Sequence, residues 1–428
     1  MEHCLARDEL SGFMESGIYQ FENSNFIFVD PVRVLNRSYS RFRVSPSGYY
    51  QRFFDFERKG FGNGDCLSSA KKRKRKEKKP HSLNEKERAA DQRHQLAKPL
   101  LLKAHELLLQ ATDLLGVMSS LNRDVGSSVG SRWLEFPKDN QSLIEHGQVW
   151  QAPLYEITLK RPESDQSIEV GESSFELRVA SLFNNLVVNE TRDEVEAEFL
   201  DHQYILPRES CFYMDIISLV SMYKSDLRQV HNLIPATASC GFSLIVVDPP
   251  WENGSAQQKS KYPTLPNRYF LALPIKKLSH RKGALVALWV TNREKFHRFI
   301  DVELFPAWGV KHISTYYWLK VKGDGSLIGD LDLFHHRPYE CLLLGYCYGE
   351  DVEDLKVLEQ SVPKDQVIIS ITGDYSRKPP IGELLQKYVP GPKPGRCIEL
   401  FAREMNPGWL SWGNEPLHFQ ESKHFTRI

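Results

Sequence analysis

Apolar positions in the second half of the chain form short continuous runs that alternate with amphipathic stretches. The continuous runs are FSLIVV, ALVALWV, STYYWLKV, YECLLLGYC, VIISI and RCIELF. Runs of this length and composition are typical of buried strands. Between them, NREKFHRFIDVELF places Phe296, Phe299 and Ile300 at helical spacing, and PIGELLQKYV predicts a second helix. Strands that alternate with helices predict an α/β domain with a largely parallel sheet over residues 206–428.

The first half of the chain predicts a mixed α+β region in three parts. NFIFVDPVRVL and YSRFRV alternate between apolar and polar positions, which predicts a β-rich segment over residues 1–68. Residues 69–95 contain KKRKRKEKK, which no core can absorb, so we expect a solvated, disordered linker. Residues 96–205 are predicted to be a helical and mixed accessory region. Its first helix has an apolar face made of Leu101, Ala104, Leu108, Ala111 and Leu115.

Composition narrows the class of protein. The 428 residues carry a formal net charge of zero, so the chain as a whole has no strong attraction for a polyanion. The seven cysteines form no C-x-x-C pair, which argues against structural zinc and a disulfide framework and favours a reducing compartment. The N-terminal MEHCLARDEL has no signal-peptide pattern, and no apolar stretch is long enough to span a membrane. We therefore expect a soluble intracellular protein.

Two charged features of the N-terminal half suggest nucleic acid. The basic run at residues 71–79 is a nuclear-import signal, a nucleic-acid patch or a charged linker, and its place between two folded-looking segments favours import into the nucleus. The segment before it interleaves arginines with aromatic residues, which suits a single-stranded nucleic acid, although a small sheet with a polar face is the alternative. These residues are Arg33, Arg37, Arg41, Arg43, Arg52, Tyr39, Tyr49, Tyr50, Phe53 and Phe54.

The run LIVVDPPW ends a predicted strand in an acid, two prolines and an indole. Pro249 and Pro250 lack N–H groups, so the carbonyls around them can face a ligand instead of a neighbouring strand. Asp248 and one such carbonyl can accept both hydrogen bonds of an exocyclic amine, while Trp251 stacks on its ring. This would present an adenine or cytosine amine to an electrophile. The alternative is an Asp-Pro turn, which we favour less because the tetrapeptide is rare by composition.

A second predicted strand end lies within RCIELFAREMNPGWLSWGNE. Glu399 closes this strand, where an acid commonly holds ribose hydroxyls, and Arg403 and Asn414 add polar contacts. The alternative is a core strand followed by a polar loop, and these residues alone do not decide between the two.

A third feature is SRKPPIGELLQKYV, in which Lys378 precedes two prolines and a predicted helix start. A lysine beside a helix N-terminus is a site for a carboxylate. S-adenosylmethionine has a ribose, a carboxylate and an electrophilic methyl, and would therefore satisfy all three features. The alternative for Lys378 is an exposed loop lysine.

In this order, DPPW, WVTNR, SRKPP and ELFAR...GWLSWGNE resemble the eukaryotic adenine-N6 methyltransferases, the family of the messenger RNA N6-adenosine methyltransferase catalytic subunit. HHRPYE, WVTNR and GWLSWGNE are most similar to the methyltransferase-like protein 4 branch. The resemblance covers roughly residues 205–420, about half of the chain. It implies a Rossmann-like, permuted S-adenosylmethionine-dependent fold, in which the catalytic motif precedes the cofactor strand.

The resemblance also implies roles for single residues on the catalytic side. Asp248 and the carbonyl of Pro249 would bind the target amine, and Asp248 would also face the amino group of the cofactor. Trp251, after Pro250, would wall the base pocket. Lys378 would bind the methionyl carboxylate.

The cofactor side is implied in the same way. Its residues would be Asp215 and Ile216 at the adenine, Glu399 and Phe401 on the cofactor strand, Arg403 and Asn414 at the ribose, and Glu415, which ends the last motif. The spacing from Asp215 to Asp248 is longer here than in the messenger enzyme. Met405 replaces a histidine of that enzyme, so no role is carried onto it.

Three short segments are predicted to flank the substrate. Tyr262 follows a basic stretch, and Asn292 and Arg293 follow a strand. His335 and His336 are interpreted as substrate-loop residues or as packing, because adjacent histidines without a third ligand seldom bind zinc. No metal is expected, since the amine attacks the methyl directly.

The branch resemblance implies a substrate adenosine in small nuclear RNA, in particular 2′-O-methyladenosine, with adenine in DNA as the alternative. A non-catalytic scaffold subunit of this family has lost the acid and tryptophan of the motif, and both are present here. An RNA-binding adaptor is the alternative of another class. The chain is hypothesised to work as a monomer, with its N-terminal region supplying the RNA surface of a partner.

Overall fold

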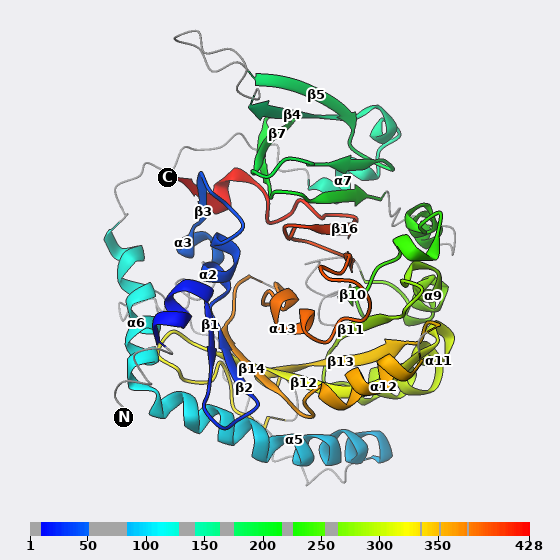
Figure 1. Ribbon diagram of the computed structural model, residues 1–428. Helices are drawn as coiled ribbons and strands as arrows, with labels where there is room; N and C mark the ends of the chain where they lie inside the picture. Colours follow the sequence, from blue (N-terminus) through cyan, green and yellow to red (C-terminus); the bar gives the residue numbers. More distant parts are fainter. Residues whose placement is uncertain are drawn as a thin grey trace, which may run out of the picture.

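The computed structural model describes residues 10–50, 84–127, 142–162, 175–215, 226–252, 264–333, 336–350, 352–374 and 376–428. Within these ranges an eleven-stranded sheet dominates, in the order β1-β2-β14-β12-β13-β11-β10-β15-β16-β9-β6 (Figure 1). Its strands are β1 (Ile18–Gln20), β2 (Phe26–Val29), β6 (Leu186–Val188), β9 (Cys211–Met214), β10 (Leu244–Val247), β11 (Ala284–Val290), β12 (Val310–Val321), β13 (Tyr339–Cys347), β14 (Val367–Ile371), β15 (Cys397–Leu400) and β16 (Trp409–Gly413).

The direction of the strands decides which residues meet at one edge of the sheet. Six of the ten neighbouring pairs are parallel, and β9, β10, β11, β15 and β16 all run the same way. Strand β13 is antiparallel to β11, so it starts at the edge where β11 ends. The predicted α/β fold with a largely parallel sheet is confirmed.

Both faces of the sheet are covered, which explains why its central strands are continuously apolar. Every residue of β10 and β11 is buried. Alternate residues join two different cores: Ile245 and Val247 pack with α9–α11, whereas Leu244 and Val246 pack with α12 and α13. The helices are α9 (Ile275–Leu278), α10 (Glu294–Phe299), a π-helical turn η5 (Ile300–Leu304), α11 (Phe305–Trp308), α12 (Val352–Ser361) and α13 (Gly382–Gln386).

The N-terminal strands belong to this same sheet. Strand β2 pairs in parallel with β14, with Phe26 opposite Val367. It leads into α2 (Pro31–Asn36), where the Asp30 side chain caps the helix by accepting from the backbone N–H groups of Val32 and Arg33. Next come β3 (Phe42–Val44) and α3 (Pro46–Tyr49), and β3 pairs with the C-terminal strand β17 (Phe425–Arg427). The C-terminal strand therefore packs against the N-terminal segment.

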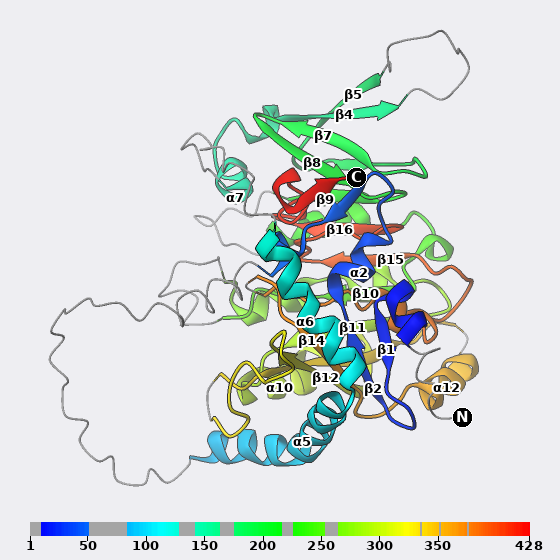
Figure 2. The same ribbon diagram turned by 90° about the vertical axis from the view of Figure 1, so that its left-hand side faces the viewer.

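Helix α5 (Glu85–Gln110) crosses the lower end of the molecule in Figures 1 and 2, and α6 (Thr112–Ser127) follows it. A capping box between Asn84 and Glu87 starts α5. Leu101, Ala104 and Leu108 are fully buried, so the predicted apolar face is confirmed there. The predicted linker over residues 69–95 needs a correction, because its last part is helical, while residues 69–83 lie outside the described chain.

A separate four-stranded antiparallel sheet has the order β5-β4-β7-β8 and lies at the top of Figure 1. Its small core includes Ile157 and Leu159 and takes in Met405 from the segment after β15.

No helix in the described ranges is long and apolar enough to cross a membrane. The remaining elements are α7 (Leu143–Gly147), η1 (Ala152–Leu154), β4 (Glu156–Pro162), β5 (Phe175–Ser181), β7 (Val195–Phe199), β8 (His202–Leu206), η2 (Asp226–Leu233), η3 (Ala238–Cys240), η4 (Asn267–Ala272) and η6 (Ser422–His424).

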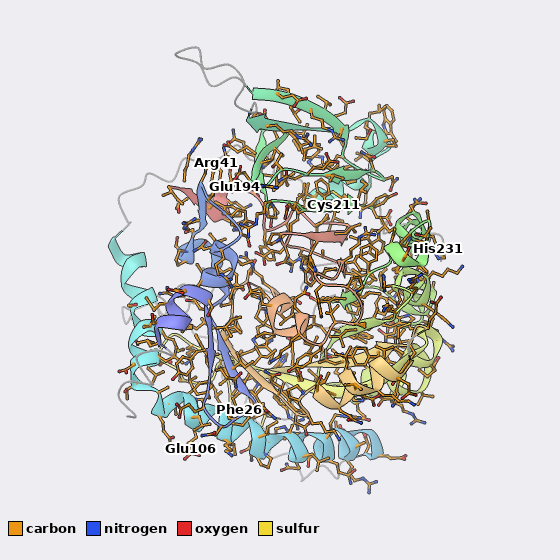
Figure 3. All side chains as sticks on the ribbon, in the orientation of Figure 1. Phe26, Arg41, Glu106, Glu194, Cys211 and His231 are labelled. Carbon is orange, nitrogen blue, oxygen red and sulfur yellow. The ribbon has the colours of Figure 1, made fainter. Side chains whose placement is uncertain are left out.

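The interleaved arginines and aromatics of the N-terminal segment serve the fold. Tyr39, Tyr49 and Tyr50 are at most 6% exposed, so they cannot stack on bases, and that interpretation is wrong for these three rings. Arg41 forms an ion pair with the buried Glu194, its neighbour in Figure 3, and Arg43 donates hydrogen bonds to two backbone carbonyls. Arg33 pairs with Asp30 and Arg37 with Glu383, whereas Arg52, Phe53 and Phe54 lie outside the described residues.

Candidate active site

Polar residues from several strands gather at one edge of the large sheet. Asp248 follows β10, Asp215 follows β9 and Asn414 follows β16, while Glu399 lies near the end of β15. These four strands are parallel, so their carboxyl ends lie together. Glu340, on β13, begins an antiparallel strand and therefore reaches the same edge.

A pocket opens at this edge, where the carboxyl ends of the parallel strands meet. The lining residues are Val246, Asp248, Trp289, Ser376, Arg377, Lys378, Pro379, Pro380, Ile381, Gly382, Glu399, Phe401, Arg403, Glu404, Asn406, Trp409 and Phe419.

Lys378 lies between two carboxylates in this pocket. Its Nζ atom is 3.3 Å from Oδ2 of Asp248 and 3.4 Å from Oε2 of Glu340. It also donates a hydrogen bond of 3.0 Å to the Ser376 hydroxyl. Lys320, at the end of β12, forms a second ion pair with Glu340. Lys378 is only 10% exposed in its side chain, so this network lies largely out of water.

The protonation states follow from burial and these partners. Burial raises the pKa of Asp248, and the opposing charge of Lys378 limits the rise. Burial also acts on Glu340, but Lys320 and Lys378 outweigh it and hold the pKa of Glu340 at about 2. Burial, then the charges of Asp248 and Glu404, raise the pKa of Glu399 to about 8. Glu340, which contacts the pocket residue Lys378, is therefore firmly ionised, and Glu399 in the pocket lining is mostly protonated at neutral pH.

The two prolines of the motif are rigid, and their carbonyls are partly engaged. The Pro249 carbonyl accepts from the Trp251 backbone N–H at 2.8 Å, and the Pro250 carbonyl accepts from Leu265 at 3.0 Å. A carbonyl oxygen has two lone pairs, so that of Pro249 can still accept from an amine.

Trp251 has a packing role in this conformation. Its indole N–H donates to the Trp289 carbonyl at 2.9 Å, which ties the end of β10 to β11. Its ring packs against Phe270 and Phe296, with centroids 5.3 and 4.9 Å away, and Trp251 is 5% exposed. The tryptophans in the pocket lining are Trp289 and Trp409. Stacking of Trp251 on a substrate ring would require these contacts to open.

The segment after β15 places the second group of predicted residues. Phe401 has a left-handed backbone, with φ of 64°, and lines the pocket. Arg403 pairs with Glu415 at 2.9 Å, and His418 also lies 3.1 Å from that carboxylate. Burial opposes ionisation of Glu415, but His418 and Arg403 together lower its pKa. Asn414 is half-buried beside this cluster.

Asp215 is placed by the neighbouring strand. Its backbone N–H donates to the Gly413 carbonyl at 2.9 Å, and the residue is 2% exposed. It therefore lies at the carboxyl end of β9, next to the end of β16, and neither Asp215 nor Asn414 is among the residues that line the pocket. Ile216 lies outside the described residues.

The predicted substrate residues divide into structural and exposed ones. The Asn292 amide donates to the Tyr339 carbonyl at 2.6 Å and so supports the start of β13. Arg293 and His336 are exposed. Tyr262 and His335 lie outside the described residues, and the described part of the chain contains no cluster of three metal-ligating side chains.

Helix α5 contacts both of these substrate-side segments. His94 stacks on the Tyr339 ring with centroids 5.9 Å apart, and its Nδ1 atom lies 3.1 Å from the Tyr339 hydroxyl. Arg93 forms an ion pair of 3.2 Å with Glu294, the first residue of α10. Helix α5 therefore contacts the start of β13 and the start of α10, the helix that follows β11.

One local prediction about Lys378 needs correction. The helix expected at Pro379 begins only at Gly382, and Lys378 lies in the preceding loop. An ion-pair network holds the lysine, and no helix N-terminus adjoins it. Glu340, Lys320 and Trp289 were not predicted, although Glu340 ends the motif HHRPYE.

Part of the chain matches a known protein family. The family described as MT-A70 matches residues 242–415, which include Asp248, Lys378 and Asn414. The chain is 35% identical over 254 residues to the N(6)-adenine-specific methyltransferase METTL4 of Mus musculus, covering 58% of this chain and 50% of the relative.

Two further relatives bear names with different substrates. The N6-methyladenosine RNA methyltransferase MTA1 of Pyricularia oryzae is 34% identical over 43% of this chain and 50% of its own length. The DNA N6-methyl methyltransferase of Caenorhabditis elegans is 29% identical over 53% of this chain and 56% of its own length. The chain thus spans about half the length of each of these relatives.

Proposed function

We propose that this chain, whose residues 242–415 are an MT-A70 domain, methylates the N6 amine of adenine in a nucleic acid with S-adenosylmethionine as donor. The observation that carries the proposal is the ion pair between Lys378 and Asp248, which lies within the pocket at the carboxyl-end edge of the sheet. MT-A70 proteins use this donor in general, and the resemblance of the four motifs supports the assignment of these residues to the donor site.

The residues present fit such a donor. An amino-acid arm is a zwitterion, and the Lys378–Asp248 pair offers a cation to its carboxylate and an anion to its ammonium group. Glu399 with its raised pKa, Arg403 and Asn414 would contact the ribose, and Asp215 the adenine. When bound, S-adenosylmethionine supplies an electrophilic sulfonium methyl.

The chain's own residues would prepare and deprotonate the amine. Asp248 and the Pro249 carbonyl accept its two protons and direct the nitrogen lone pair. Lys378 and Glu340 hold the Asp248 carboxylate in place. The new N–C bond would form as the bond between the methyl carbon and the sulfonium sulfur breaks, leaving a neutral thioether. The surplus proton leaves to water or to Asp248, whose raised pKa makes it a better acceptor than an exposed carboxylate. No covalent bond to the protein is needed.

The finer substrate follows from the branch resemblance. We propose 2′-O-methyladenosine in a small nuclear RNA, methylated in the nucleus by a monomer. The contacts of α5 with Tyr339 and Glu294 support a role for the N-terminal region on the substrate side. Adenine in DNA is the second candidate, which the name of the nematode relative favours. An adaptor without catalysis would leave the buried Lys378–Asp248 pair without a purpose.

Single-turnover methyl transfer from labelled donor tests the proposal. The acceptors are three matched oligonucleotides: RNA with adenosine, the same RNA with one 2′-O-methyladenosine, and DNA. We expect transfer that prefers the 2′-O-methyl RNA and that disappears in Asp248→Ala. Donor binding without transfer to any of the three would exclude these substrates, and absence of donor binding would favour the adaptor.

A further inference from the structure

The loop between β14 and α13 carries Lys378 and is wrapped around a ring from the N-terminal segment. We call the described residues 372–374 and 376–380 the Lys378 loop. Gly373 packs so closely on Tyr49 that a Cβ atom there would lie 2.7 Å from the ring's Cε1 atom. The guanidinium carbon of Arg377 lies 3.9 Å from the centroid of the same ring. Two residues of the loop therefore contact one N-terminal aromatic side chain.

Arg377 is enclosed on its other sides as well. Its guanidinium carbon lies 4.1 Å from the centroid of Phe419, and its Nε atom donates to Glu404 at 3.1 Å. A second hydrogen bond runs from its Nη2 atom to the same carboxylate. Arg377 is 3% exposed. A guanidinium that is stacked between two rings and held by a bidentate carboxylate has a single orientation, which fixes the backbone beside it.

Tyr49 is anchored from the other side. It is 1% exposed and ends α3, where its backbone N–H donates to the Ser45 carbonyl at 2.8 Å. Ser45 in turn donates to the His424 carbonyl at 2.8 Å. Tyr50 packs edge-on against the ring with centroids 4.9 Å apart. The ring is therefore a fixed point, and the loop takes its position from it.

We infer that Tyr49 is a positioning residue of the donor site, which fixes the Lys378 loop so that the Lys378 ammonium faces the anionic arm of the ligand. Lys378 follows Arg377 directly, so movement of Arg377 out of its cage shifts the ammonium away from Asp248. The inference rests on the proposed function, in which the anionic group is a methionyl carboxylate. It makes the N-terminal segment part of the donor site.

Deleting residues 1–95 cannot test the role of this segment, because β2 pairs with β14 and deletion would remove strands from the sheet. Point variants of the full chain avoid this. Tyr49→Leu removes the ring that Gly373 and Arg377 contact, whereas Tyr49→Phe keeps it.

Calorimetric binding of two ligands separates positioning from general damage. S-adenosylhomocysteine carries the amino-acid arm, and 5′-methylthioadenosine lacks it. We expect Tyr49→Leu to weaken binding of the first at least about fivefold and of the second less than about twofold, because only the first uses Lys378. Tyr49→Phe should restore the wild-type ratio of the two affinities.

Phe42→Leu is the matched control, since Phe42 is a buried ring of the same segment on β3. It should leave the ratio unchanged even if it lowers the melting temperature. If circular dichroism shows Tyr49→Leu unfolded, Gly373→Ala disturbs the same contact from the loop side. An equal loss for both ligands, or no loss, overturns the inference alone. A wild-type chain that binds neither ligand overturns the proposed function with it.

Discussion

Lys378 and Asp248 form an ion pair of 3.3 Å although they follow different strands, β14 and β10. The same ammonium lies 3.4 Å from Glu340 on a third strand. Burial raises the pKa of Asp248, Lys378 lowers it, and Glu340 raises it again. Loss of Lys378 should therefore raise the pKa of Asp248, and loss of Glu340 should lower it.

Lys378→Met should slow methyl transfer and move the acidic limb of its pH–rate profile to higher pH. Without the neighbouring cation, burial and Glu340 raise the pKa of Asp248 further, so the carboxylate is lost at a higher pH. We expect the single-turnover rate at neutral pH to fall about 10²-fold or more, as for loss of a preorganised electrostatic contact. An acidic limb at the same pH in the variant and the wild type would contradict an electrostatic coupling between Lys378 and Asp248.

Glu340→Gln is the matched change of opposite sign. Glu340 is ionised in the native state, with a pKa of about 2, and its charge raises the pKa of Asp248. Removing that charge should move the acidic limb to lower pH and reduce the rate less than Lys378→Met does. The same series of single-turnover measurements checks this. A shift to higher pH would show that Glu340 acts mainly by placing Lys378.

The local features of this site were predictable, whereas its long-range contacts were not. Asp248 and Glu399 were found because an acid at the end of an apolar run lies at the ligand-binding edge of a parallel sheet. Glu340 was missed because it starts a strand, and it reaches the same edge only because β13 is antiparallel. Tyr49 packs against a loop more than 300 positions later along the chain, a contact that no periodicity encodes.

The roles of single aromatic residues were harder to predict from the sequence than those of the acidic residues, again because they depend on long-range contacts. A tryptophan beside a catalytic acid fits ring stacking and core packing equally well in sequence, and only the fold distinguishes them. Here the Trp251 N–H bonds to the Trp289 carbonyl, and both rings are buried. The sequence likewise favours a base-stacking surface for the N-terminal tyrosines, whereas in the structure they fill the core.

Trp251→Phe should lower stability by about 1–3 kcal/mol, because the Trp289 carbonyl loses a buried hydrogen-bond donor. The ring contacts with Phe270 and Phe296 can largely be kept. Urea unfolding measures the change, and calorimetry with S-adenosylhomocysteine should show unchanged affinity. Trp308→Phe is a suitable control, since its N–H likewise donates to a backbone carbonyl, that of Phe270, and Trp308 does not line the pocket. A loss of donor affinity in Trp251→Phe alone would place Trp251 in the donor site.

Glu399→Gln should stabilise the free protein at alkaline pH. Burial and neighbouring carboxylates raise the native pKa of Glu399 to about 8, from an ordinary value of 4.5. Between these values the native state binds the proton and the unfolded chain releases it. The contribution of this proton to the free energy of unfolding of the wild type is therefore fully present below pH 4.5 and is lost as pH rises towards 8. Glutamine cannot ionise, so the variant should lack this fall. The difference in free energy of unfolding between variant and wild type should therefore be about 2–4 kcal/mol more in favour of the variant at pH 8 than at pH 5. Urea unfolding at pH 5 and pH 8 measures it. Glu353→Gln, on the exposed side of α12, should keep the wild-type dependence, and a Glu399 variant that also keeps it would mean that Glu399 is ionised in the native pocket.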